Sequence, residues 1–210
     1  MEQREEQMDK ETSWDQLLQI HTTGRDDTNS DEYRYPYEPT PYTVLERLAS
    51  SGLIGEEDVV LDYGCGKGRV DFFLAHETKA STVGIEYDPR IYTSALENQA
   101  LGGFQLKTEF VLTRAESYEV PPEVNRCYFF NPFSVEILHK VMARIIESYY
   151  ENPREIFLFF YYPSDEYISY LMTVDELDFY DEIECEDLFD GKDSRERIMI
   201  FSLPDYEMEE

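Results

Sequence analysis

The sequence predicts an α/β protein built on a doubly wound, mostly parallel sheet of seven strands that ends in an antiparallel hairpin. Two observations carry this prediction. First, short apolar runs alternate with segments of helical spacing from about residue 40 to residue 165, as expected for strands covered by helices on both faces. Second, the first apolar run, residues 59–63, leads into the glycine-rich stretch 64–68. Such a turn is typical of a ligand-binding loop at the carboxyl end of a parallel strand.

The predicted strands fall into two groups. The first five are residues 59–63, 82–86, 107–112, 126–130 and 155–162, and the last two are residues 179–184 and 197–203. The run 155–162 is apolar throughout, as expected of a strand that is covered on both faces. The last two strands are joined around Gly191, which predicts the antiparallel hairpin.

Helices are predicted between these strands, each with one apolar face. They begin close to Thr40-Pro41, Gly68, Asp88-Pro89 and Ser134, where Ser, Thr and Asp are expected as N-caps and Pro as the first helical residue. The apolar stripe of residues 1–20 predicts a further short helix, and the composition of residues 21–37 predicts a loop. We therefore divide the chain into an N-terminal helical and loop extension or lid, residues 1–38, and one domain, residues 39–210.

The chain is strongly acidic. Its 210 residues include 46 Asp and Glu against 18 Lys and Arg, which gives a formal net charge of −28. Such a field repels phosphate backbones and anionic membranes, so we expect neither nucleic acid nor a membrane as partner. The segment from Ser164 to Asp190 contains eleven acids and no Lys or Arg. It is either a docking face for a basic partner or a solvated surface that keeps the protein soluble.

The cysteines and the start of the chain bear on its location. No apolar run is long enough to span a membrane, and the acidic first residues lack the apolar core of a secretory signal. Cys65, Cys127 and Cys185 are widely separated, which indicates a reducing compartment and no zinc or other metal site. We therefore expect a cytoplasmic protein.

The spacing of the glycines distinguishes between ligands. A dinucleotide fold uses Gly-x-Gly-x-x-Gly to bring a helix N-terminus against a pyrophosphate, whereas here the third glycine comes one residue early, in Gly64-x-Gly66-x-Gly68. Asp62 precedes the turn, and an acid there suits a cationic ligand better than a pyrophosphate. Glu86 ends the second strand, 24 residues after Asp62, where an acid binds ribose hydroxyls. The alternative is a glycine-rich turn that serves packing alone.

This combination resembles the first motif of the class I S-adenosylmethionine (SAM)-dependent methyltransferases, which have a Rossmann-like fold. The segments Tyr-Glu-Pro-Thr-Pro-Tyr (37–42), Asp-Tyr-Gly-Cys-Gly-Lys-Gly-Arg (62–69) and Phe-Asn-Pro-Phe-Ser (130–134) are similar to those of a poorly characterised bacterial group of that family. The resemblance implies SAM as cofactor. The cofactor-binding residues that it implies are Asp62, Tyr63, Gly64, Cys65, Gly66, Gly68, Glu86, Tyr87, Glu116 and Asn131. Arg114 stands where the family usually has an acid for the adenine amine, with Glu116 or the backbone of Ala115 as the substitute.

Asn131-Pro132-Phe133 ends the fourth predicted strand. It is similar to the Asn/Asp-Pro-Pro-aromatic motif of amino-group methyltransferases, although it has a single proline. The resemblance implies that these three residues are catalytic, with Asn131 holding the target amine and Phe133 stacking on the substrate. Hydrogen-bond acceptors there help an amine to lose its proton and to direct its lone pair. Tyr42 and Phe133 are expected to shape the acceptor pocket. The alternative is a turn-forming Asn-Pro followed by a core Phe.

These observations predict a SAM-dependent methyltransferase that acts on an unidentified acceptor, at a nitrogen of a small molecule or of a protein side chain. One rival function is a regulatory or scaffold protein that binds SAM without transferring its methyl group and docks a basic partner through residues 164–190. A second rival is a nicotinamide-dependent oxidoreductase, which the glycine spacing disfavours.

Overall fold

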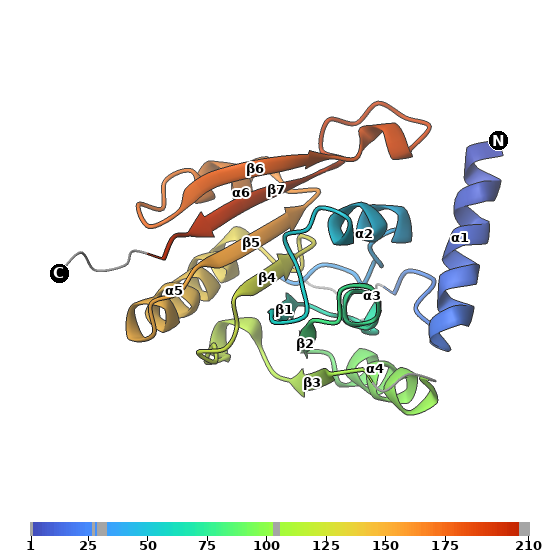
Figure 1. Ribbon diagram of the computed structural model, residues 1–210, viewed down its shortest axis with the longest axis horizontal. Coiled ribbons are helices and arrows are strands. Elements are labelled where there is room, and N and C mark those ends of the chain that lie inside the picture. The colour runs from blue at the N-terminus through green and yellow to red at the C-terminus, as the bar shows by residue number, and fades with distance from the viewer. Residues whose placement is uncertain (1, 27, 29–32, 103–105, 206–210) are drawn as a thin grey trace.

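A single mixed sheet forms the centre of the molecule (Figure 1). The computed structural model describes residues 2–26, 28, 33–102 and 106–205. The strands are β1 Val59–Tyr63, β2 Ser81–Glu86, β3 Thr108–Leu112, β4 Arg126–Phe129, β5 Ile156–Tyr161, β6 Asp178–Glu184 and β7 Arg197–Leu203. Their order in the sheet is β3-β2-β1-β4-β5-β7-β6. Strands β1 to β5 are parallel, and β7 runs antiparallel between β5 and β6. The predicted fold class is confirmed.

Helices cover both faces of this sheet. They are α1 Glu2–Leu18, α2 Tyr42–Ala49, α3 Arg69–Thr78, α4 Pro89–Leu101, α5 Val135–Glu151 and α6 Asp165–Leu171, with short 3-10 turns η1 Ala115–Ser117 and η2 Glu186–Leu188. Apolar side chains of α2, α3 and α4 pack on one face, and those of α5 and α6 pack on the other. Two apolar layers therefore enclose β5, whose six residues are all buried, as its unbroken apolar run predicts.

The sheet reverses its strand order between β1 and β4. From β1 the chain moves outward through β2 to β3, and it then returns to place β4 on the other side of β1. The loops after these two strands diverge toward opposite faces, which opens a crevice at their carboxyl ends. That crevice is where a doubly wound sheet binds its ligand.

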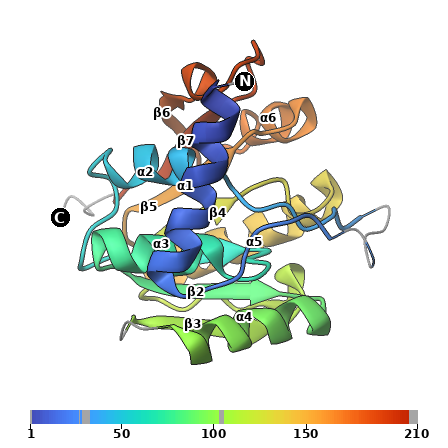
Figure 2. The same ribbon diagram turned by 90° about the vertical axis from the view of Figure 1, so that its right-hand side faces the viewer.

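Helix α1 packs on the outer side of α2 and α3 (Figure 2). The ring of Trp14 lies 5.9 Å from that of Tyr42 in α2 and 4.7 Å from that of Phe73 in α3, measured between centroids. Its indole N–H donates to Glu46 at 2.8 Å. The N-terminal helix is thus packed against the domain by aromatic contacts, each of which adds about 0.5–1.5 kcal/mol beyond the area buried.

Some predicted boundaries differ from the structure. Helix α2 begins at Tyr42 with Pro41 as its N-cap residue, so Thr40 does not cap it. The Thr40 hydroxyl is hydrogen-bonded to the Tyr128 hydroxyl at 2.9 Å instead, because Thr40 is buried beside the sheet. The short helix α6 and the two 3-10 turns were not predicted.

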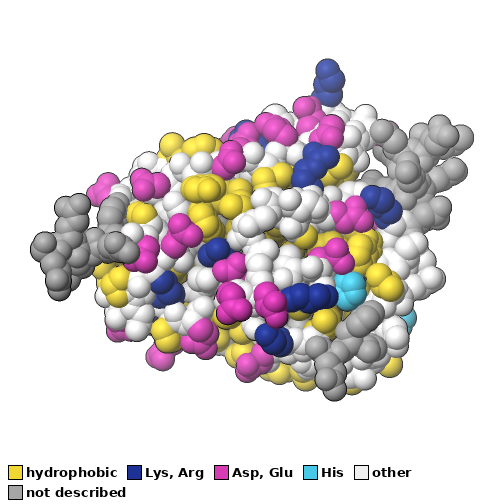
Figure 3. Space-filling model, viewed as in Figure 1, with side chains coloured by type: hydrophobic (Ala, Val, Ile, Leu, Met, Phe, Trp, Pro, Cys, Tyr) yellow, Lys and Arg dark blue, Asp and Glu magenta, His cyan; other side chains and the backbone are white. Residues whose placement is uncertain are grey.

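The acidic segment 164–190 includes the edge strand of the sheet. Strand β6 pairs only with β7, and most of its residues are exposed. Charged side chains on such an edge discourage pairing with a strand of another molecule, which favours the solvated-surface interpretation. Acidic side chains are also spread across the face seen in Figure 3. No helix in the described ranges is long and apolar enough to cross a membrane.

Candidate functional site

A cavity lies at the predicted crevice. The predicted residues that line it are Asp62, Tyr63, Gly64, Cys65, Glu86, Tyr87, Glu116, Pro132 and Phe133. They come from the ends of β1, β2 and β4 and from η1. Residues 34–40, from the end of the N-terminal extension and the first residues after it, also line the cavity. The structure therefore brings most of the predicted site residues together.

The glycine-rich turn adopts a backbone that requires glycine. Gly64 has a φ of +79°, in the left-handed region, and a Cβ there would lie 2.6 Å from Cβ of Pro132. The N–H groups of Gly64 and Cys65 both donate to the carbonyl of Ile85 at 3.0 Å. The turn is consequently fixed between β2 and the loop after β4, with no room for a side chain at Gly64.

Glu86 ties this turn to the end of β2. Its buried carboxylate accepts the N–H of Gly66 at 3.1 Å and those of Tyr87 and Asp88 at 2.9 Å each. Burial raises the pKa of Glu86, and these three hydrogen bonds oppose that rise. A carboxylate offers about four lone-pair sites, so acceptor capacity remains at a residue that lines the cavity.

Asp62 and Asp71 form a buried carboxyl pair behind the turn. Asp62, at 3% exposure, lines the cavity from β1, and Asp71 lies fully buried in the first turn of α3. Burial raises the pKa of Asp62 to about 7, and burial with the charge of Asp62 raises that of Asp71 well above its usual range. No Lys or Arg of the described residues lies within 4 Å of either carboxyl. Burial and the charge of Asp62 therefore disfavour ionisation of Asp71, and no cation in the described part of the chain compensates either carboxyl at close range.

The stretch that we call the covering segment, residues 33–40, closes the cavity. Its backbone pairs with the loop after β4, because the N–H of Tyr35 donates to Pro132 at 3.2 Å and that of Ser134 donates to Tyr33 at 2.8 Å. The Tyr37 ring lies against Gly66, and its hydroxyl donates to the carbonyl of Thr22 at 2.6 Å. This segment thus forms a wall shared with the predicted motif around Pro132.

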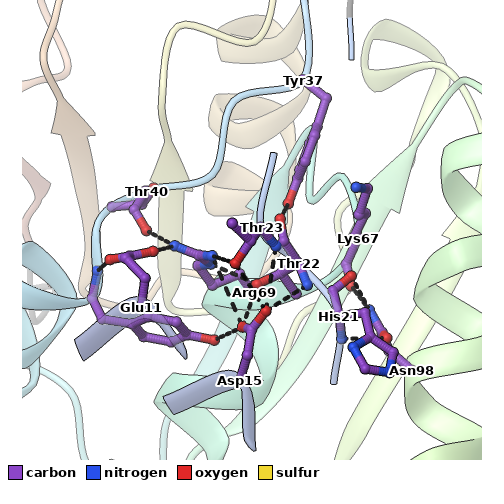
Figure 4. Close-up of polar contacts among 11 residues, drawn as sticks. Glu11, Asp15, His21, Thr22, Thr23, Tyr37, Thr40, Lys67, Arg69 and Asn98 are labelled. Carbon is purple, nitrogen blue, oxygen red and sulfur yellow. Dashed lines mark hydrogen bonds and ion pairs between the residues drawn. The ribbon is translucent and has the colours of Figure 1, made fainter. Parts of the chain in front are cut away.

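Arg69 anchors the N-terminal extension to the first residue of α3 (Figure 4). Its guanidinium is 2% exposed, donates to Thr22 at 2.7 Å and to the carbonyl of Thr40 at 3.2 Å, and pairs with Glu11. Asp15 accepts from the hydroxyl of Thr22 at 2.6 Å. A buried guanidinium needs such partners because an unpaired buried charge is costly.

A second set of contacts in Figure 4 ties the extension to α4. The side chain of Asn98 accepts from the N–H of His21 at 2.8 Å and donates to the carbonyl of Lys67 at 2.9 Å. Nothing in the sequence marks Arg69 or Asn98 for this role, because their partners lie far away in the chain. Glu11, for example, precedes Arg69 by 58 residues.

Tyr42, which the sequence predicts to shape the acceptor pocket, lies away from this cavity. Its side chain is fully buried between α1, α2 and α3, where the hydroxyl donates to Asp15 at 2.6 Å. The Arg69 guanidinium lies 4.3 Å from its ring centroid. Tyr42 does not line the cavity because the helix that it begins turns its ring toward the core of the protein.

Gly66, Gly68 and Asn131 lie outside the cavity lining. The Tyr37 ring covers Gly66, and Gly68 packs against the ring of Phe110. Asn131 has a φ of +39°, and its amide donates to the carbonyl of Tyr162 at 2.5 Å and accepts from the N–H of Ser164 at 3.3 Å. It lines a neighbouring hollow instead.

Glu116 is engaged by a cation of the covering segment. Arg34 pairs with its carboxylate at 3.0 Å, and the same guanidinium lies 5.0 Å from the ring centroid of Tyr87. Arg114, where an acid is usual, is exposed. The predicted substitute acid thus lines the cavity but is already neutralised by Arg34.

The structure is similar in fold to solved methyltransferases, while no family model matches the chain. An RNA methyltransferase from Salinibacter ruber, in complex with S-adenosyl-L-homocysteine, superimposes with a TM-score of 0.54 at 20% identity over 82% of this chain and 98% of that one. A TehB-like SAM-dependent methyltransferase from Corynebacterium glutamicum gives 0.55 at 14% identity, over 94% and 98% of the two chains. A putative tRNA (m1A22) methyltransferase from Streptococcus pneumoniae gives 0.57 at 14% identity, over 81% and 73%.

One curated relative is similar in sequence. A protein-lysine N-methyltransferase of Saccharolobus islandicus (strain REY15A) is 34% identical over 64 residues. The match spans 30% of this chain and 40% of the relative's length. Together with the fold, it confirms the resemblance to class I SAM-dependent methyltransferases. The sequence predicts that nucleic acid is not a partner. Several structural neighbours are RNA methyltransferases, so the comparisons do not support this prediction.

Proposed function

We propose that this protein is a SAM-dependent methyltransferase that methylates a nitrogen of a small molecule or of a protein side chain. One observation carries the proposal: the buried carboxyl of Asp62 lines the switch-point cavity, Asp71 lies fully buried behind it, and neither carboxyl has a cation within 4 Å among the described residues. The ammonium of a methionine moiety is a cation of the right kind for such a pair.

The residues around the cavity fit the rest of this cofactor. Asp62 would hold the ammonium, and the remaining acceptor capacity of Glu86 would take ribose hydroxyls. The cofactor supplies a methyl group on an activated sulfonium. The chain's own work is then to orient both ligands and to exclude water, and the covering segment closes the cavity for that purpose.

The nature of the acceptor rests on two supports. The curated relative acts on protein lysine, as its name states, and a net charge of −28 attracts amines and repels polyphosphates. The alternative acceptor is RNA, as in the named activity of several structural neighbours. An amine acceptor must be held with its lone pair free, so its proton has to leave to solvent or to a nearby carboxylate before transfer.

Calorimetry with S-adenosylhomocysteine (SAH) tests the cofactor site. We expect SAH to bind and NAD not to bind. We also expect Asp62→Asn to weaken the binding of SAH by about 1–3 kcal/mol, because the charge that pairs with its ammonium is lost. Asp175→Asn, at an exposed acid after α6, is the matched control and should leave the affinity unchanged. Absence of SAH binding by the wild-type protein would refute the proposal. SAH binding without any methyl transfer from labelled SAM to cell extract would favour the regulatory alternative.

A further inference from the structure

A second hollow adjoins the cofactor cavity. Phe130 and parts of the covering segment, including Tyr35 and Glu38, line both. The second hollow extends beyond them to the carboxyl end of β5 and the start of β7. A ligand there would thus lie next to a ligand of the first cavity, with the side chain of Phe130 at their boundary.

Three aromatic rings form one wall of this hollow. The centroid of the Phe130 ring lies 4.7 Å from that of Tyr161 and 6.5 Å from that of Tyr162, and the two tyrosine rings are 6.1 Å apart. Phe130 and Tyr162 are only partly buried. Grouped rings of this kind attract cations through the negative charge of their faces, and the guanidinium of Arg195 already lies 4.4 Å from the centroid of the Tyr162 ring.

The hollow also contains a carboxylate, that of Glu196, which forms no ion pair within 4 Å among the described residues. Burial raises the pKa of Glu196, and the charge of Arg195 acts on it and opposes that rise. Glu196 accepts the hydroxyl hydrogen of Tyr161 at 2.7 Å. Glu38 is the second acid of the lining, and it pairs at 3.7 Å with Arg25, which is 60% exposed and also lines the hollow.

We infer that this second hollow is the acceptor site and that it binds an alkylammonium group. The inference rests on the proposed function and adds the place and the charge of the acceptor. The aromatic wall would receive the alkyl chain and the cation, and Glu196 would pair with the ammonium. Of the predicted acceptor motif, Asn131 lines this second hollow, whereas Pro132 and Phe133 line the first cavity.

A pair of bisubstrate probes tests the inference in the full chain. Both carry a nitrogen in place of the sulfur of SAH and a short alkyl extension from it, and one extension ends in an ammonium and the other in a methyl group. We expect the ammonium probe to bind about tenfold more tightly, as a cation–π contact and one charge-assisted hydrogen bond allow.

Three variants test whether the preference for the ammonium probe arises in the second hollow. Glu196→Gln keeps an acceptor for the Tyr161 hydroxyl and should remove most of the preference, while SAH affinity stays at the wild-type value. Phe130→Leu should reduce the preference separately. Glu123→Gln changes an exposed acid just before β4, at the opposite end of that strand, and should retain the full preference.

The outcomes separate the two proposals. Equal affinity of the two probes, or a preference that Glu196→Gln leaves intact, would overturn the inference while SAH binding still supported the cofactor site. Transfer of label from SAM to purified RNA, with none to lysine peptides, would likewise overturn it. Failure of SAH itself to bind would refute the proposed function instead.

Discussion

The ring of Tyr37 lies directly against the backbone of Gly66. A Cβ at Gly66 would fall 2.2 Å from two of the ring carbons, and the φ of Gly66 is +59°. The covering segment is thus fitted to a glycine in the turn that carries the cofactor motif. Gly66, the second glycine of the predicted spacing, is therefore required by packing as well, because the Tyr37 side chain occupies the space beside it.

We expect Gly66→Ala to destabilise the fold and to weaken SAH binding. Left-handed backbone costs about 1–2 kcal/mol for a non-glycine residue, and the overlap with Tyr37 adds about 1–3 kcal/mol. Urea denaturation and calorimetry measure both effects. Gly52→Ala is the matched control, because Gly52 has a φ of +78° and open space around it. Equal losses for the two variants would show that the contact with Tyr37 is unimportant.

The carboxyl pair predicts a pH dependence of the ligand-free protein. The pKa of Asp62 is raised from 3.8 to about 7 in the fold, so the protonated form is favoured in the folded state. The contribution of this group to the free energy of unfolding is complete below about pH 4 and is lost as the pH rises through about 7. Denaturation at several pH values should show this loss, and Asp71→Asn should reduce it. A stability that rises across this range in wild type but not in the variant would contradict the assignment.

The binding of SAH should also depend on the protonation of the carboxyl pair. In the proposed site the ammonium of SAH would pair with an ionised Asp62, so binding should release a proton below about pH 7. Calorimetry in buffers of different ionisation enthalpy measures that proton. Affinity should therefore rise with pH toward 7 and level off above it. No proton release at pH 6 would indicate that Asp62 is already ionised in the free protein.

Glu86→Gln should lower both stability and SAH affinity. The amide oxygen keeps part of the acceptor set but loses the charge that holds three backbone N–H groups, and each charge-assisted bond is worth about 1.5–3 kcal/mol. Thermal unfolding and SAH titration give the two losses. Unchanged SAH affinity with reduced stability would confine Glu86 to a structural role.

Removal of the buried guanidinium should be costly. Arg69→Met leaves Glu11 and Asp15 without their cation in a buried site, which costs about 3–5 kcal/mol. The control is Arg144→Met, because Arg144 forms an exposed pair with Glu147 within α5 and such pairs contribute about 0–1 kcal/mol. Similar free energies of unfolding for the two variants would show that the network in Figure 4 adds little.

Local sequence patterns were sufficient to predict the strands and the cavity. Apolar runs mark β1, β2 and β5, and the acids that line the cavity lie at the ends of two of these strands. Such positions follow from chain order alone, since parallel strands bring their carboxyl ends to one edge of the sheet. The fold class and the placement of Asp62 and Glu86 could therefore be predicted.

Side-chain direction in the loops could not be predicted in the same way. The orientation of Tyr42 depends on Asp15 and Arg69, and the conformation of Asn131 depends on the backbone of Tyr162 and Ser164. These are contacts between distant segments, for which a linear pattern carries no information. The motif thus predicted that Asn131 lies at the end of β4. It could not predict which of the two hollows beside Phe130 the Asn131 side chain lines.

The covering segment has a kinetic consequence. Four of its residues, Tyr35, Pro36, Glu38 and Pro39, line both the cofactor cavity and the second hollow, and backbone hydrogen bonds hold it against the turn around Pro132. A single displacement of the covering segment would therefore expose the ligands of both hollows at once. We expect exchange of the spent nucleoside and departure of the modified amine to share a single slow step, so that turnover follows the rate of uncovering more closely than the rate of bond formation.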